Sequence, residues 1–492
     1  YTSASSCVKI NNFLSEFFPI SRGIRQGCPL SAILYVLMAE PMRNAIVNNT
    51  RINCFNIKGA KALIFQHADD STFFVNDMKS IQTIFGVFEE YSKASGSKVN
   101  IDKSEILPIG GSNPPEDGKV KVIKGHTEVL GLCIGPDKYA CEHENWDNKI
   151  NKCLKILKTW KARKMSLKGK VLIVNTLIIS RIIYVLNLSH LPDWVAPKLK
   201  AAIIDFIWSG KRHRIKYDVL ISSIKAGGLG LLDIERMRNA LRCKFIKKLF
   251  DNDRPLNPVA KALLLYNLNK GLDLDYDIFR VFVPKKLKCK LTKFSSELLN
   301  AWEKVTDKFL VKPMNVDEVL HQPLMYNPFI VNDDGDTFDV IDIFNNDFCT
   351  LKDMIYEYVP GFLPNQSIIE LMSPVFNNSK LSKLCTNLVQ YIPSKWKKAI
   401  NRSALAKKKC NTITLHMMDQ NTDTIIDVSK TSTRFFNNLL RKYEEVSVTP
   451  AGLEHWRTHF GNESLKIPFD VCFGGLKENY MCQNDYFLAH NC

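Results

Sequence analysis

The spacing of apolar and polar residues predicts short strands and helices in the first 135 residues. Two β-prone runs, 62–66 (ALIFQ) and 71–75 (STFFV), flank two adjacent aspartates and predict a hairpin. The apolar residues of 31–47 recur with helical spacing, which predicts a helix with Ser31 as its N-cap. A second amphipathic helix is expected over 81–96, ended by a glycine, and a strand over 127–135.

Further along, the pattern becomes helical. Ile150, Leu154, Leu157 and Trp160 keep the spacing of one helix face. The apolar run 171–188 approaches the length of a membrane span, but it contains two asparagines and an arginine, which are costly in lipid. We therefore expect it to be a buried helix. Trp160 and Trp208 are expected in the core rather than stacked on bases.

A Pro-containing segment at 252–258 is a candidate boundary, after which helical and extended pieces alternate. The pattern predicts an α+β protein. Three regions are expected: 1–135, mixed; 136–250, basic and helical; and 251–492, an extension of uncertain fold, mostly helical.

Charge separates the middle region from the rest of the chain. The 492 residues include 67 Lys and Arg against 50 Asp and Glu, a formal net charge of +17. Between residues 151 and 225 there are 16 Lys and Arg but only three Asp. A basic region of this kind favours a polyanionic partner, nucleic acid before membrane.

The fourteen cysteines are scattered, and no C-x-x-C pair occurs. This spacing gives no complete zinc knuckle. Together with the lack of a secretion signal, it suggests a reducing compartment, with most cysteines acting as small buried side chains.

The aspartates between the two predicted strands are Asp69 and Asp70. Adjacent carboxylates repel each other unless a cation lies between them. Mg²⁺ prefers oxygen ligands and supports two-metal nucleotidyl transfer. A solvated turn is the alternative, and for an isolated pair of aspartates it is the more frequent one.

The neighbouring segments favour the metal site. RGIRQGCPLS (22–31) precedes the aspartates, and SGSKVNIDKSEIL (95–107) and EVLGLCIG (128–135) follow. In this order, the segments resemble the reverse transcriptase of non-long-terminal-repeat (LINE-type) retrotransposons. The resemblance is good over 18–249. It implies a right-hand polymerase fold, with a partial palm in 1–135 (an antiparallel sheet plus helices) and a helical thumb in 136–250.

The resemblance also implies roles for individual residues. Asp69 and Asp70 match the metal-binding carboxylates, and Lys103 a lysine that assists departure of pyrophosphate. The remaining matches are the loop beside the nucleotide and template (Arg25, Gln26 and Gly27), the primer grip (Leu130 and Gly131) and contacts to duplex phosphates (Lys161, Arg163, Lys168 and Lys170). For Lys103, a solvated surface lysine is an equally supported interpretation. The implied ligands are Mg²⁺ (or Mn²⁺), an RNA template, a DNA primer and deoxynucleoside triphosphates, without a membrane. The implied location is nuclear and cytoplasmic, as a retrotransposon ribonucleoprotein.

Two features depart from the family pattern. His67 stands where an aromatic Tyr or Phe is usual, and none of the 21 residues before Arg22 is an Asp. The family has a further catalytic aspartate before that point. We therefore expect a fragment that supplies two of three metal carboxylates. The alternative is a catalytically inactive remnant that still binds nucleic acid.

Overall fold

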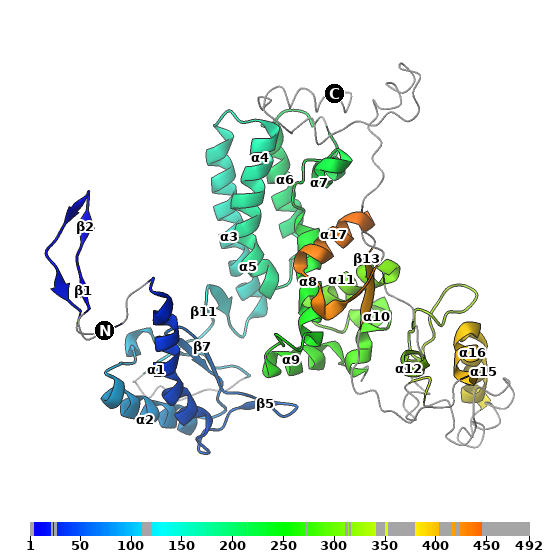
Figure 1. Cartoon of the computed structure of the whole chain (residues 1–492), viewed down its shortest axis with the longest axis horizontal. Helices are drawn as coiled ribbons and strands as arrows, with labels where there is room; N and C mark the ends of the chain where they lie inside the picture. Colours follow the sequence, from blue (N-terminus) through cyan, green and yellow to red (C-terminus); the bar gives the residue numbers. More distant parts are fainter. Residues whose placement is uncertain are drawn as a thin grey trace. The chain divides into compact units, whose positions relative to one another are not determined.

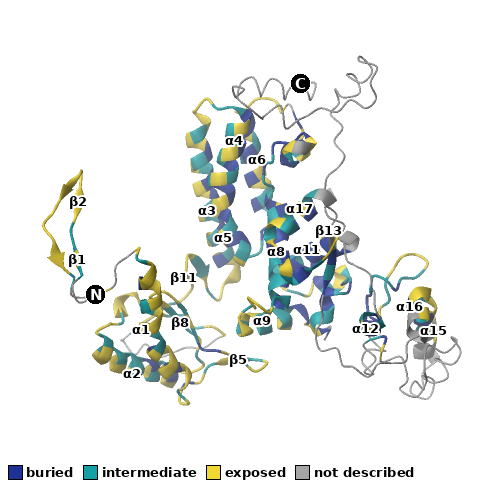
Figure 2. Cartoon of the chain, viewed as in Figure 1, coloured by how far each residue is buried: buried dark blue, intermediate teal, exposed yellow. Residues whose placement is uncertain are grey.

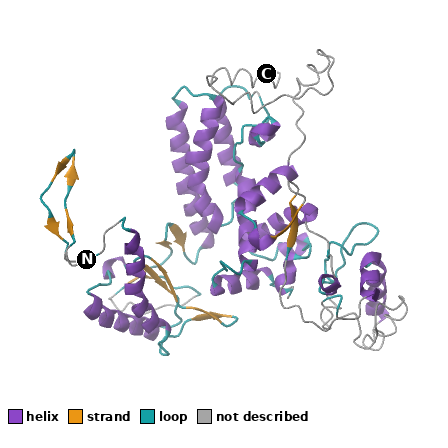
Figure 3. Cartoon of the chain, in the orientation of Figure 1, coloured by secondary structure: helices purple, strands orange, loops and turns teal. Residues whose placement is uncertain are grey.

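The computed structural model forms two compact units, Tyr1–Thr127 and Glu128–Cys492 (Figure 1). The residues that it describes are 4–20, 23, 27–110, 120–213, 215–270, 274–309, 313, 316–340, 350–352, 379–402, 415–419 and 424–444. Each unit is a mixture of helices and short strands, as expected for the α+β class (Figure 3). The predicted region limits at 135 and 250 stay predictions.

The first unit begins with a narrow antiparallel hairpin. Its inner ladder pairs Ile10 with Phe13, and the turn residues Asn11 and Asn12 both have positive φ, the conformation that a tight two-residue hairpin turn requires. Its large apolar side chains, such as Phe13, are exposed (Figure 2). The four strands are β1 (Ser5–Ser6), β2 (Lys9–Ile10), β3 (Phe13–Leu14) and β4 (Phe18–Pro19).

The N-cap of helix α1 (Pro29–Val47) is not the predicted Ser31. The cap is Cys28 and Pro29 opens the helix, where a missing N–H costs nothing. The Ser31 N–H instead donates to the Cys28 carbonyl, so Ser31 lies inside the first turn. The helix continues through Pro41. Met42 and Ile46 are buried, whereas the side chains of the N-terminal half are largely exposed.

Helix α2 (Met78–Ser95) confirms the predicted amphipathic helix and its glycine stop. The Asp77 carboxylate accepts the Ser80 N–H at 2.7 Å, and this bond lowers the pKa of Asp77. Gly96 ends the helix in the left-handed conformation. The helix packs on a small core formed by Met42, Ile46, Ile52, Leu63 and Ile84.

The strands of the first unit form two-stranded ladders rather than one wide sheet. The predicted hairpin around the aspartates is present, and an isolated bridge between Cys54 and Val75 lies beside it. The short elements are β5 (Phe55–Ile57), β6 (Ala60–Ala62), β7 (Ile64–His67), β8 (Asp70–Phe73), η1 (Ile101–Lys103), β9 (Glu105–Ile106) and β10 (Lys121–Val122).

The prediction of one continuous strand over 127–135 is wrong. The structure has a hairpin there, with strands β11 (Thr127–Val129) and β12 (Leu132–Ile134) paired in one sheet. Leu130 and Gly131 have φ of +49° and +80° and form the turn between them. Apolar character suggests a continuous strand at Leu130, but the glycine beside it allows the chain to reverse.

The second unit starts with a bundle of helices. Asp137 caps α3 through the N–H groups of Tyr139 and Ala140. The core of the bundle includes Trp146, Ile150, Leu157 and Trp208, as the helical spacing predicts for Ile150 and Leu157. The helices are α3 (Lys138–Lys161), α4 (Leu167–Ile173), η2 (Val174–Ile179, a π-helix), α5 (Ser180–Leu188), α6 (Val195–Trp208), α7 (Tyr217–Ile221) and η3 (Ile224–Ala226).

The long apolar stretch Leu167–Leu188 packs inside this unit. Both it and Pro29–Val47 are long and apolar enough to cross a membrane by length and composition, which is weak evidence for a span. Ile178, Ile182 and Val185 are fully buried in the bundle core. The Asn175 amide, placed in the π-helical turn, bonds the Gly230 carbonyl at 3.0 Å and the Leu232 N–H at 2.9 Å. These contacts support the expected buried helix.

Helix α8 (Ile234–Phe250) links this core to a second one. Leu241 packs into the bundle core, while Cys243 and Ile246 belong to the second core, where α11 and α17 also pack on α8. The remaining elements are α9 (Pro258–Leu268), η4 (Asp275–Phe279), α10 (Lys285–Lys288), α11 (Lys293–Phe309), α12 (Val316–Leu320), α15 (Ser379–Tyr391), α16 (Ser394–Arg402), β13 (His416–Asp419), β14 (Thr424–Asp427), η5 (Val428–Lys430) and α17 (Thr433–Glu444).

Candidate functional site

The two aspartates occupy a tight turn between β7 and β8. His67 pairs with Asp70 in the ladder, which leaves Ala68 and Asp69 as the two turn residues. Ala68 has φ of +52°, an unfavourable value for a residue with a Cβ. Strained backbone of this kind persists only where surrounding contacts hold it, and it is frequent at functional sites.

A tyrosine from α1 provides such a contact. The Tyr35 hydroxyl donates a hydrogen bond to the Ala68 carbonyl at 3.0 Å. Partial burial, and then the negative charge of Asp69, raise the pKa of Tyr35. The hydroxyl therefore stays protonated at neutral pH and remains a donor to the turn.

The carboxylates themselves are open to solvent. Asp69 and Asp70 are both exposed, and among the described residues no hydrogen bond or ion pair engages either carboxylate. Aromatic pairs stabilise the strands behind them: Phe65 packs edge-on against Phe74, and Phe73 against Phe88. The turn therefore presents two free oxygen donors on a supported hairpin, the donor chemistry that a hard divalent cation prefers.

Two other predicted residues of the first unit are described. Lys103 is exposed at the end of η1, where its backbone N–H bonds the Asn100 side chain at 3.2 Å. Gly27 is exposed with φ of +83°, and a Cβ there would meet nothing within 4 Å. No contact places either residue against the aspartate turn within the described part of the chain. Arg25 and Gln26 lie outside the described residues.

The predicted primer-grip residues form the β11–β12 turn. The Leu130 carbonyl accepts the Tyr184 hydroxyl at 2.6 Å, and a Cβ on Gly131 would lie 3.9 Å from the ring of Tyr184. Tyr184 comes from α5, so the turn is attached to the helical bundle. Leu130 exposes about half of its surface, 47%.

The four basic residues proposed for phosphate contacts divide into two kinds. Lys161, Arg163 and Lys168 are exposed; Lys161 pairs with Asp205 at 2.6 Å, and the Arg163 guanidinium stacks on Trp160. Lys170 is partly buried and instead forms hydrogen bonds within the bundle.

The Lys170 ammonium donates to the Ile207 carbonyl at 2.9 Å and to the Ser209 hydroxyl at 2.6 Å, where α6 ends. Burial, and then Lys161 and Lys211, lower the pKa of Lys170. Lys170 is partly buried and its ammonium is held at the end of α6, so it is a weaker candidate for a phosphate contact than the three exposed residues.

Tyr35 and Tyr184 were not recognised in the sequence. Both lie in apolar helical runs and read as core aromatics. Their role depends on which carbonyl the hydroxyl reaches, 33 and 54 residues away in the chain. A tyrosine hydroxyl on an otherwise apolar helix is the available signal, because it requires a partner when it is partly buried.

Comparison with known proteins supports the expected relationship. Residues 2–134 match the family described as "Reverse transcriptase (RNA-dependent DNA polymerase)". Over 337 residues, 67% of the chain, the sequence is 26% identical to the "Transposon TX1 uncharacterized 149 kDa protein" of Xenopus laevis. Residues 2–134 are thus similar to reverse transcriptases, and a longer part of the chain is similar to a transposon protein, which agrees with the expected resemblance.

The extent of these matches is limited. The chain spans about a quarter, 26%, of the length of the transposon protein. The family match covers the first unit and the β11–β12 hairpin, but not the helical bundle. A reverse transcriptase domain implies a nucleic-acid template and primer and a divalent metal.

Proposed function

We propose that this chain is part of a retrotransposon RNA-directed DNA polymerase that extends a DNA 3′-end on an RNA template. Its substrates are deoxynucleoside triphosphates, and its metal is Mg²⁺ or Mn²⁺. The expected location, in the nucleus and cytoplasm as a ribonucleoprotein, belongs to the same proposal.

The observation that carries this proposal is the turn at Ala68. Two exposed carboxylates, without protein partners among the described residues, stand on a hairpin whose strained first turn residue is bonded by Tyr35. A turn that is only solvated, which is the alternative interpretation, does not need a hydrogen bond from a side chain of α1 to hold it. The turn also falls within the segment that matches reverse transcriptases.

The residues of the chain divide the task as follows. Asp69 and Asp70 would hold the divalent cation, which supplies charge stabilisation at the phosphate and activates the attacking 3′-hydroxyl. Tyr35 holds the turn in position. Exposed lysines and arginine on the helical bundle bind the phosphates of the duplex without selecting a sequence. Lys103 remains a candidate for assisting the departure of pyrophosphate.

The test is primer extension by the full-length protein that carries this chain. A labelled DNA primer on an RNA template is expected to lengthen in Mg²⁺ with all four deoxynucleoside triphosphates, and to stay unextended when the cation is chelated. Binding of the same duplex is measured in parallel by filter retention.

The two outcomes separate the proposal from its alternative. Extension that depends on the cation supports a polymerase. Tight binding without any extension in Mg²⁺ or Mn²⁺ supports the inactive nucleic-acid-binding remnant instead.

A further inference from the structure

A row of three aromatic rings lies on the surface of the helical bundle in the second unit. Tyr139 and His143 stand one turn apart on α3, with ring centroids 6.4 Å apart and planes tilted by 36°. Trp194, the residue before α6, continues the row, because its ring centroid lies 5.7 Å from that of His143 with a tilt of 34°. These separations are in the range of stacked aromatic pairs. The row therefore joins side chains from two separate segments of the chain.

One end of the row is open to solvent. Tyr139 exposes 75% of its surface and His143 is exposed, whereas Trp194 is partly buried and packs on the bundle core. A single exposed tyrosine on a protein surface needs no explanation. Here the exposed ring extends a row that is anchored in the bundle, so a further flat ring can add to the row at Tyr139.

The first turns of α3 are fixed before any ligand binds. The Asp137 carboxylate accepts the Tyr139 N–H at 3.0 Å, and the His143 imidazole pairs with Asp147, Nδ1 to Oδ2, at 3.0 Å. Rings held in this way lose little side-chain freedom when a ligand stacks on them, which favours binding.

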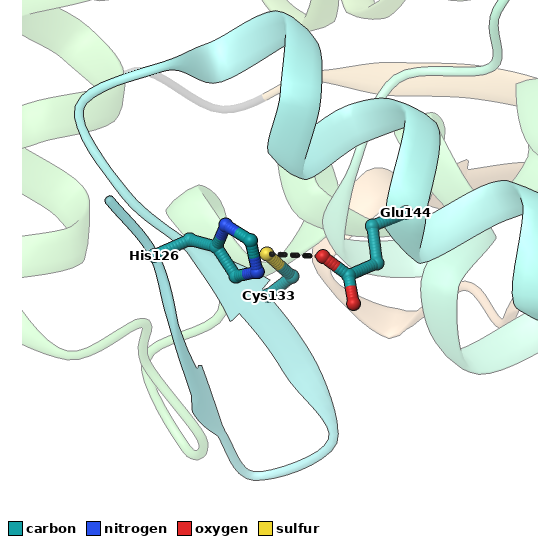
Figure 4. Close-up of side chains that lie close together, drawn as sticks. All are labelled: His126, Cys133 and Glu144. Carbon is teal, nitrogen blue, oxygen red and sulfur yellow. Dashed lines mark hydrogen bonds between the residues drawn. The ribbon is translucent and has the colours of Figure 1, made fainter. Parts of the chain in front are cut away.

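Contacts with strand β12 hold the same part of α3. The Asn145 side chain accepts the Cys133 N–H at 2.7 Å and donates to the Cys133 carbonyl at 2.9 Å. The Cys133 thiol also lies 3.6 Å from the Glu144 carboxylate, Sγ to Oε2 (Figure 4). The start of α3 is therefore supported from a second element, and the row of rings stands on a well-held part of the unit.

The row lies on the pair of helices that also carries the exposed cations of the bundle. Helices α3 and α6 pack on each other, and Lys161 pairs with Asp205 at 2.6 Å near the ends of both. His143 and Trp194 meet near the starts of the same helices. The row and the cationic end of the bundle are therefore separated by roughly 30 Å of helix.

We propose that Tyr139, His143 and Trp194 form a stacking platform for the unpaired bases of a single-stranded RNA. Every base has an aromatic face, so stacking of this kind accepts any sequence, and single-stranded RNA is commonly bound by bases stacked on aromatic side chains. The inference rests on the proposed function, which requires an RNA template with bases that are not yet paired. The duplex phosphates would meet the cations at one end of the helix pair, and the unpaired template bases the row at the other.

Charge favours RNA over a cationic peptide, the other ligand that aromatic rings bind. The Lys198 ammonium lies over the Trp194 ring, 5.2 Å from its centroid, so a second cation at that ring would be repelled. Lys198 is exposed and can also meet the phosphate beside a stacked base. Asp147, an acid beside the row, is paired with His143. Because both signs of charge lie near the row, stacking is expected to supply most of the binding.

The test is binding of a fluorescent single-stranded RNA of mixed sequence by the full-length protein. Anisotropy follows the binding without deoxynucleoside triphosphates or divalent cation. Tyr139→Ala is expected to weaken binding about tenfold, the order typical for loss of one stacked base. The slope of log affinity against log salt should stay the same, because no phosphate contact is removed.

Matched variants control for this result. Tyr139→Phe keeps the ring and is expected to bind RNA like the parent. Tyr266→Ala removes another exposed tyrosine of the second unit, on α9, and is expected to change nothing. His143→Ala removes the middle ring and is expected to weaken binding about tenfold as well. A blunt-ended RNA–DNA duplex, which has no unpaired base, should bind the parent and Tyr139→Ala alike.

RNA affinity unchanged in both Tyr139→Ala and His143→Ala would overturn the proposal, as would an equal loss in Tyr139→Phe. A lysine-rich peptide that binds the parent but not Tyr139→Ala, with RNA binding unaffected, would assign the row to a cationic peptide instead. The assay needs no extension. Failure of the platform therefore leaves the polymerase proposal standing where RNA-templated extension is observed, and a protein without extension can still show the platform.

Discussion

Single hydrogen bonds hold the two turns that the proposed function uses. At the aspartate turn the donor is Tyr35, and at the Leu130 turn it is Tyr184. Each hydroxyl donates to the backbone carbonyl of a turn residue with positive φ, Ala68 in the first turn and Leu130 in the second. These hydroxyls therefore position the turns, while the carboxylates and the backbone of the turns are the groups expected to reach the ligands.

Tyr35→Phe tests this positioning role. A typical hydrogen bond contributes about 0.5–1.5 kcal/mol, so extension is expected to slow by about two- to tenfold, with little change in primer–template affinity. Single-turnover extension and duplex binding are measured separately.

Tyr91→Phe is the matched control for that variant. The Tyr91 hydroxyl also donates to a backbone carbonyl of α1, that of Met38, at 2.8 Å. The Tyr91→Phe variant is expected to lower the free energy of unfolding by a similar amount without slowing extension. Equal losses of rate in the two variants would contradict a specific role for Tyr35.

A partly buried acid gives a prediction on pH. Burial raises the pKa of Asp277, in η4, to about 6, although Arg280 opposes the shift. The pKa of Asp277 is higher in the folded protein than the unfolded value of 3.8. The protonated Asp277 carboxyl therefore contributes to stability below about pH 4, and this contribution is lost as pH rises through 6.

Asp277→Asn removes this pH dependence. The amide oxygen can still accept the Arg280 hydrogen bond, and the amide carries no charge to be desolvated. At pH 7 the free energy of unfolding of the variant is therefore expected to be about 1–3 kcal/mol higher than that of the parent. At pH 4 the two proteins should be nearly equal. Urea unfolding followed by circular dichroism measures both values, and a variant less stable at both pH values would refute the assignment.

Secondary structure elements differ in how far the sequence specifies them. The hairpin around Asp69 and helix α2 are local: alternating apolar positions, an Asp cap and a Gly stop are all present within the segment. Both were predicted. The prediction of one continuous strand over 127–135 was wrong, because the apolar pattern gives no sign that the chain reverses at Leu130 and Gly131.

Tertiary contacts explain what the sequence could not provide. The contact between the Cys133 thiol and the Glu144 carboxylate depends on the β11–β12 hairpin lying against α3, which no local sequence pattern indicates. The bond from Tyr35 likewise requires the packing of α1 on the hairpin. Lys170 was grouped with surface cations, since nothing local indicates that its ammonium caps the end of α6.

The segment after α7 gives a prediction for a single glycine. A Cβ on Gly228 would lie 2.1 Å from the Ser222 carbonyl oxygen, far inside contact distance. Gly228→Ala is therefore expected to lower the free energy of unfolding by about 1–3 kcal/mol. Gly169→Ala, whose Cβ would meet its nearest neighbour at 3.4 Å, is the matched control.

The same urea unfolding curves distinguish the two glycine variants. A shift of the midpoint in Gly228→Ala, with little change in Gly169→Ala, is the expected result. Equal stability of Gly228→Ala and the parent would mean that the turn after η3 adapts to a side chain.

At the scale of the whole molecule, the second unit has two cores joined by α8. Arg242 on this helix is fully buried and bonds the carbonyls of Leu186 and Ser189 as well as the Glu297 carboxylate. These bonds connect the end of α5, α8 and α11. A buried charge with all of its partners in place makes the two cores depend on each other, so we expect them to unfold together.

Charge distribution governs binding of the whole molecule to nucleic acid. The triple variant Lys161→Gln, Arg163→Gln, Lys168→Gln removes three exposed cations of the bundle. Affinity for an RNA–DNA duplex is expected to fall, and the slope of log affinity against log salt to decrease by about one for each phosphate that the variant no longer neutralises.

A charge-matched variant controls for net charge. Lys285→Gln, Lys286→Gln, Lys290→Gln removes three exposed lysines from the region around α10. It should leave the salt slope nearly unchanged. Equal effects of the two triples would show that general charge, rather than the bundle surface, controls binding.

RNA-templated addition of one nucleotide tests the central claim most directly, that Asp69 and Asp70 are the catalytic carboxylates of a polymerase. The full-length protein is compared with its Asp69→Asn and Asp70→Asn variants, and with Asp102→Asn, which changes another exposed aspartate of the same unit. We predict that both turn variants lose addition by at least roughly a thousandfold, on the order expected for removal of a metal ligand, while Asp102→Asn retains it and all bind duplex alike. Undiminished addition by Asp69→Asn and Asp70→Asn would contradict the assignment.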